Sequence, residues 1–161
     1  MHLAVALRAA GRGADALNEF HKVLQLDENF WPAHFLLGIL NASLGNIEEA
    51  AASAEKAYSL APWMTVNIGS LAAMLKRTGE LGRSEELLQK LLPGEAYGAP
   101  LGLAHYYLYC GEPEQAIHWS EKAIQQRQPA VLFFLNVHLQ FFRSNPRWPR
   151  LARLLNLPEM G

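Results

Sequence analysis

Six histidines and one cysteine are the residues of this sequence best suited to metal binding or catalysis. The histidines are His2, His21, His34, His105, His118 and His138. None forms the His-x3-His spacing that places two imidazoles on one helix face for a metal. His105 and His138 each fall midway along the first helix of an expected unit, so these two can approach each other. We expect packed histidines, or histidines lining a groove, and no metal or cofactor.

Cys110 is the only cysteine, so the chain forms no intrachain disulfide and no cysteine-rich metal site. A catalytic thiol needs a partnered base and an oxyanion site, and the sequence carries no signature of either. The glycines of LPGEAYGAPLG lack the preceding strand of a phosphate-binding loop. The spacing of Gly98 and Gly102, four residues apart at a helix start, instead predicts close packing against a neighbouring helix. We therefore expect no enzyme.

The last part of the chain is basic. It carries Trp148 and four arginines with no acid among them: Arg143, Arg147, Arg150 and Arg153. The whole chain has a formal net charge of -1, which gives no broad electrostatic case for nucleic acid. We expect these arginines to form the solvated face of a terminal helix.

No apolar run reaches the roughly 18 residues that span a bilayer. The N-terminus lacks the cationic start of a secretory signal. We expect a cytoplasmic protein that binds neither nucleic acid nor membrane.

Four segments share one register: RAAGRGADAL, ASLGNIEEAA, KRTGELGRSE and LYCGEPEQAI. Their glycines are Gly11, Gly45, Gly79 and Gly111, so the spacings are 34, 34 and 32 residues. A period near 34 indicates stacked helical hairpins. Each glycine is expected to end a helix in the left-handed conformation, with the next helix starting within about two residues.

The chain resembles tetratricopeptide repeat proteins over about residues 1–143. The best copy, residues 31–62, carries the Leu37-Gly38 pair and Pro62. The family pattern implies a small residue five positions after each glycine, where the chain has Ala16, Ala50, Ser84 and Ala116. Ala72 and Ala104 depart from the pattern, which prefers glycine there. The resemblance implies an all-α, right-handed superhelical solenoid of antiparallel helical hairpins with a C-terminal capping helix.

The expected units cover residues 1–30, 31–64, 65–96 and 97–129, then a degenerate unit at 130–143 and a cap segment at 144–161. Within them we expect helices at 2–10, 14–26, 31–44, 47–60, 64–78, 81–92, 97–110, 114–127, 130–143 and 148–155. In the last helix, Leu151, Leu154 and Leu155 form an i, i+3, i+4 stripe that predicts a buried face.

In the family that the chain resembles, the first helix of each hairpin lines an inner groove. Carrying those positions over implies these partner-binding candidates: Phe35, Ile39, Lys76, Arg77, Leu101, His105, Tyr109 and Leu139. The polar clamp for chaperone C-termini is absent, since Phe35 and Ile39 occupy its positions. Lys76 and Arg77 give one local positive spot between two apolar stretches, so we expect a ligand with apolar anchors and one central acid. The alternative that these apolar residues only pack between hairpins stays open.

The leading hypothesis is a scaffold that binds a peptide, helix or partner domain in this groove, with self-association left open. The segment NPRWPRLARLLNLP is similar to one that follows the repeats of bacterial regulators with an upstream nucleotide cyclase or winged-helix domain. A second hypothesis is therefore the sensory or oligomerising arm of a larger bacterial signalling protein.

Overall fold

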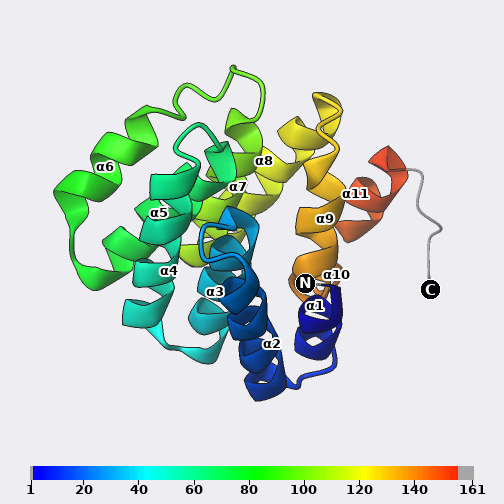
Figure 1. Cartoon of the computed structure of the whole chain (residues 1–161). Coiled ribbons are helices and arrows are strands. Elements are labelled where there is room, and N and C mark those ends of the chain that lie inside the picture. Colours follow the sequence, from blue (N-terminus) through cyan, green and yellow to red (C-terminus); the bar gives the residue numbers. More distant parts are fainter. Residues whose placement is uncertain (1, 156–161) are drawn as a thin grey trace.

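The computed structural model describes residues 2–155, and all regular secondary structure within them is helical (Figure 1). The helices run in the order α1 (His2–Ala9), α2 (Gly13–Leu26), α3 (Trp31–Leu44), α4 (Ile47–Leu60), α5 (Thr65–Thr78), α6 (Leu81–Gln89), α7 (Ala99–Tyr109), α8 (Pro113–Gln125), α9 (Ala130–Val137), α10 (Leu139–Arg143) and α11 (Trp148–Leu154). None of these helices is long and apolar enough to cross a membrane.

Successive helices pair into hairpins, and the hairpins stack into a superhelical solenoid. The pairs α1–α2, α3–α4, α5–α6 and α7–α8 each pack side by side, and α5 packs along α7 of the next hairpin. The apolar faces of the hairpins form one continuous hydrophobic core. The expected all-α solenoid is confirmed.

The four repeat glycines all adopt the left-handed conformation, with φ of +74° at Gly11, +86° at Gly45, +92° at Gly79 and +75° at Gly111. This region strains residues with a Cβ, so glycine ends one helix and turns the chain into the next. The sequence period therefore marks the four hairpin turns correctly.

Small residues set the distance between helices. Ala16, Ala50, Ser84 and Ala116 are all buried, as the repeat register predicts. The closest approach joins α5 to α7, where a Cβ at Gly69 would lie 1.9 Å from the Gly102 carbonyl oxygen. A Cβ at Gly102 would lie 2.5 Å from the Thr65 carbonyl oxygen. The expected close packing at Gly102 is therefore present, and it holds two first helices of neighbouring hairpins in backbone contact.

Two helix predictions were wrong. The helix expected at 81–92 ends at Gln89 and passes into turns before Pro93. The helix expected at 130–143 breaks at His138, whose φ and ψ are -114° and 25°. No proline or glycine marks this break. The His138 ring instead contacts Tyr109 of α7, so a tertiary contact accompanies the local departure from helical backbone angles.

The terminal helix α11 packs against α8. Leu151 is fully buried, but Leu154 is 42% exposed, so the predicted leucine stripe is only partly buried. Arg147 contacts the Glu121 carboxylate of α8 at 2.7 Å, and Arg150 contacts it at 3.4 Å. Both arginines attach α11 to the preceding hairpin, because Glu121 is a buried acid that needs counter-charges. Both were expected on a solvated face. Arg150 is, with 61% of its side chain exposed, but the Arg147 side chain is only 32% exposed.

We predict that Gly102→Ala destabilises the protein by about 1–3 kcal/mol, since the added methyl group meets rigid backbone and forces α5 and α7 apart. Gly82→Ala is the matched control. A Cβ at Gly82, in α6, meets nothing within 4 Å, so alanine should stabilise that helix by about 0.5–1 kcal/mol. Urea unfolding followed by circular dichroism measures both free energies. Equal effects of the two substitutions would contradict the close contact.

Candidate functional site

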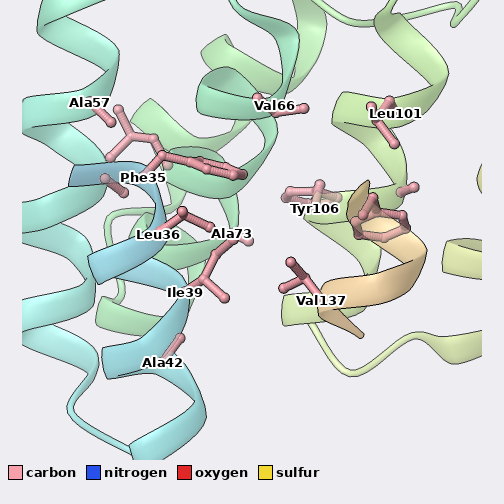
Figure 2. Close-up of a cluster of buried hydrophobic side chains, with 14 of the residues drawn as sticks. Phe35, Leu36, Ile39, Ala42, Ala57, Val66, Ala73, Leu101, Tyr106 and Val137 are labelled. Carbon is pink, nitrogen blue, oxygen red and sulfur yellow. The ribbon is translucent and has the colours of Figure 1, made fainter. Parts of the chain in front are cut away.

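The inner face of the solenoid, where the resemblance places a groove, is filled by its own side chains. Phe35 of α3 contacts His105 of α7 with ring centroids 5.3 Å apart, and His105 contacts Phe134 of α9 at 4.4 Å. Figure 2 shows Phe35 and Ile39 on one side of this cluster, with side chains of α7 and α9 on the other. Helices from three different units therefore meet directly across the inner face.

The predicted groove residues are consequently core residues. The exposed fraction is 8% for Phe35, and 3% for each of Ile39, Leu101 and His105. The space left beside Phe35 and Ile39 has a volume of about 10 Å³, roughly that of one water molecule. These four side chains pack between helices, as the packing alternative describes.

His105 and His138 do come together, with ring centroids 6.0 Å apart. The His138 Nε2 and the Tyr109 hydroxyl are hydrogen-bonded at 3.2 Å. Burial lowers the pKa of His105 to about 3. Burial, and then the charges of His105 and Arg8, lower the pKa of His138 well below its usual value. Both rings are therefore neutral at physiological pH, and their packing depends on that neutral state.

The first and fifth units also touch. The Arg8 guanidinium of α1 donates a hydrogen bond of 2.6 Å to the Val137 carbonyl oxygen at the end of α9, which lies 129 residues away in the sequence. Figure 1 shows α1 beside α10. The solenoid curves until its two ends meet, and this junction is called the seam here.

An open cleft of about 800 Å³ lies along the seam. We call it the seam cleft. Its apolar wall consists of Val137, Leu139 and Phe141. Two small residues, one histidine, three neutral polar side chains and two arginines complete the lining: Ala10, Gly11, His138, Ser43, Asn136, Gln140, Arg8 and Arg143. This volume falls in the range of ligand-binding pockets, and the mixture of apolar wall and polar groups is typical of them.

The seam cleft is electropositive. Arg8 and Arg143 line it, no acidic side chain does, and neither arginine forms an ion pair with a residue between 2 and 155. Arg8 has its Nε buried without a hydrogen-bond acceptor. A guanidinium stays charged at any physiological pH, so both positive charges persist in the cleft.

The remaining candidates lie in three places: the seam cleft, the outer surface and the histidine pair. Leu139 is half-buried and lines the seam cleft. Lys76 is exposed and paired with Glu112 at 3.3 Å, so it is not a free positive charge between apolar stretches. Arg77 is exposed at the end of α5. Tyr109 is half-buried and faces the histidine pair rather than solvent.

Sequence reasoning missed Arg8 as a site residue, because nothing in the sequence relates α1 to α9. Arg143 did attract attention as one of the tail arginines, but its cleft position depends on the seam. Among the described residues, no group of three or more His, Cys, Asp or Glu side chains is placed to hold a metal ion. Burial raises the pKa of the half-buried Cys110 thiol, which leaves it mainly in its less nucleophilic form.

Comparisons with known proteins agree with this architecture. Residues 32–62, which form α3 and α4, match the family model for the tetratricopeptide repeat. The crystal structure of MamA superposes with a TM-score of 0.55 at 20% identity, covering 97% of this chain and 92% of that one. The TPR-like repeats of a putative kinesin light chain from Podosopora anserina give a TM-score of 0.51 at 17% identity, covering 96% of this chain and 89% of that one. A search of curated proteins finds no match.

We predict that the free energy of unfolding falls as the pH drops below about 6.5, the pKa of an unfolded histidine. The unfolded chain takes up protons there while buried His105, with its pKa of about 3, does not. Each such histidine contributes a slope of at most about 1.4 kcal/mol per pH unit. Denaturant unfolding at several pH values should show a shallower slope between pH 6.5 and 4 in His105→Gln than in the wild type. An identical slope would contradict the buried neutral state.

We further predict that Phe35→Ala lowers the free energy of unfolding by about 3 kcal/mol or more, because it leaves a cavity in the closed inner face. Lys76→Ala should cost less than about 1 kcal/mol, since it removes only an exposed ion pair. Thermal or urea unfolding of the two variants makes the comparison. If Phe35 lined an open groove, the two costs would be similar.

Proposed function

We propose that this tetratricopeptide-type solenoid is a protein-interaction scaffold that holds a partner segment in the seam cleft. The observation that carries the proposal is the combination of a sealed inner face with an open, lined cleft of about 800 Å³ where the solenoid ends meet. Solenoids of helical hairpins offer extended surfaces to partners, and the surface here is concentrated at the seam.

The apolar wall of the cleft supports this location. Leu139 and Phe141 are only half-buried, so a partner that covers them gains apolar burial without displacing other side chains. Burying one such anchor contributes about 1.5–3 kcal/mol. By contrast, a ligand at Phe35 or His105 first has to separate helices that pack in the core.

The scaffold role does not require chemistry from the chain, and the described residues supply no arrangement of nucleophile and base that suggests any. The cytoplasmic location stays a prediction, as does self-association. The hypothesis of an arm of a larger bacterial regulator rests on the tail resemblance alone. No contact within the described residues favours it over the scaffold.

We predict that Leu139→Ala weakens partner binding at least about fivefold, because it removes an apolar anchor from the cleft wall. Leu132→Ala is the matched control, since Leu132 lies on the neighbouring helix α9 with 54% of its surface exposed and does not line the cleft. The partner is identified by photo-crosslinking from Gln140→p-benzoylphenylalanine, purified, and titrated against both variants by calorimetry.

The same photo-reactive residue at the exposed Gln89 of α6 controls for chance encounters. A specific adduct from position 140 and none from position 89 supports the proposal. Equal losses of affinity for Leu132→Ala and Leu139→Ala, or adducts only from position 89, would place the partner elsewhere.

A further inference from the structure

We infer that the seam cleft selects an acidic peptide segment, with Arg8 and Arg143 as the groups that bind its carboxylates. The inference rests on the proposed function, and it adds the chemistry of the partner. The first argument is charge complementarity. The chain as a whole has a formal charge of -1, yet the cleft lining contains two arginines and no acid.

Several cationic side chains outside the cleft form ion pairs with acidic side chains. Arg12 is paired with Asp15, Arg83 with Glu55, and Arg147 with Glu121, at distances of 2.7 to 2.9 Å. Acidic side chains thus neutralise cationic ones at several places along the surface. Within residues 2–155, Arg8 and Arg143 have no such acid, and neither do the exposed Lys56 and Arg77. Arg8 and Arg143 differ from those two because they line one cleft together, where both charges are left for a partner.

The structure fixes the Arg8 guanidinium in a position to bind a carboxylate. Its bond to the Val137 carbonyl oxygen fixes the guanidinium at the seam, but a neutral carbonyl does not offset its charge. Its Nε is buried and has no acceptor. A carboxylate that enters the cleft therefore meets a positioned and partly desolvated positive charge, where an ion pair is screened less than on an open surface. The planar fork of the guanidinium also matches a carboxylate.

Arg143 differs from Arg8 because its side chain is exposed at the end of α10. An exposed guanidinium can form an ion pair with a partner without disturbing the core. Arg143 therefore contributes to the association rate and to the register of the bound peptide more than to the stability of the fold. Asn136 and Gln140 also line the cleft and are exposed. Their amides are able to hydrogen-bond the backbone of an extended peptide.

The apolar wall completes the specificity. A ligand recognised by charge alone gains nothing from the apolar side chains of Leu139 and Phe141. A peptide with an apolar side chain next to an acidic one contacts both the apolar wall and the arginines of the cleft. An acidic segment with an interspersed aliphatic or aromatic residue fits this lining better than nucleic acid, which presents a continuous row of phosphates.

A random dodecapeptide display library, selected on the immobilised protein, tests the inference. We expect the enriched peptides to carry Asp or Glu beside an apolar residue. The strongest peptide is then labelled and titrated by fluorescence anisotropy, together with a copy in which each Glu and Asp is replaced by Gln and Asn. The amide copy should bind at least about tenfold more weakly, and the affinity of the acidic peptide should fall with added salt.

Arg143→Gln should weaken the acidic peptide at least about fivefold. Lys56→Gln is the control, because it makes the same change in net charge at an exposed site on α4 outside the cleft. Its effect should stay below about twofold. Enrichment without acids, equal binding of the acidic and amide peptides, or equal effects of the two substitutions would overturn the inference. If Leu139→Ala still weakens such peptides, the cleft remains the docking site and only its acid selectivity is refuted.

Discussion

The contact of Phe35 with His105 is the interaction on which the arrangement of the whole molecule depends. These residues belong to α3 and α7, which are the first helices of the second and fourth hairpins. In a solenoid, each repeat ordinarily contacts only its neighbours. Here the array curves tightly enough for non-neighbouring units to share a core, so each end of the chain is stabilised by residues from the other. The neutral state of His105 is part of that core, because burial disfavours a charged imidazolium.

Tight curvature follows from the small residues between helices. Gly69 and Gly102 bring the backbones of α5 and α7 into direct contact, where any side chain would separate them. His105, on the same helix as Gly102, contacts both Phe35 and Phe134. The bond from Arg8 to Val137 then joins α1 to α9. The closed inner face and the seam thus both join units that are not neighbours along the chain.

Because the inner face is closed, the accessible concave surface lies at the seam rather than in the middle of the solenoid. Side chains at the implied groove positions of α3 and α7 become core, and residues from α1, α3, α9 and α10 line the seam cleft. The charges follow the same division. Several cations of the outer helices pair with acids, whereas the cleft holds two arginines that form no ion pair with the described residues. Shape and charge therefore both concentrate recognition at one place.

The sequence alone determined the local structure, because turns and helix ends depend on residues close in the chain. The glycine period located the four hairpin turns, and the bounds of α3 and α4 agree with the expectation at 31–44 and 47–60. The burial of Ala50 and Ala116 followed from the same register. Tertiary structure decided the rest. The break at His138, the burial of His105 and the meeting of Arg8 with Val137 depend on the summed rotation of successive hairpins. A small change in the angle at each step decides whether the ends of a solenoid meet or stay apart, and no local pattern encodes that angle.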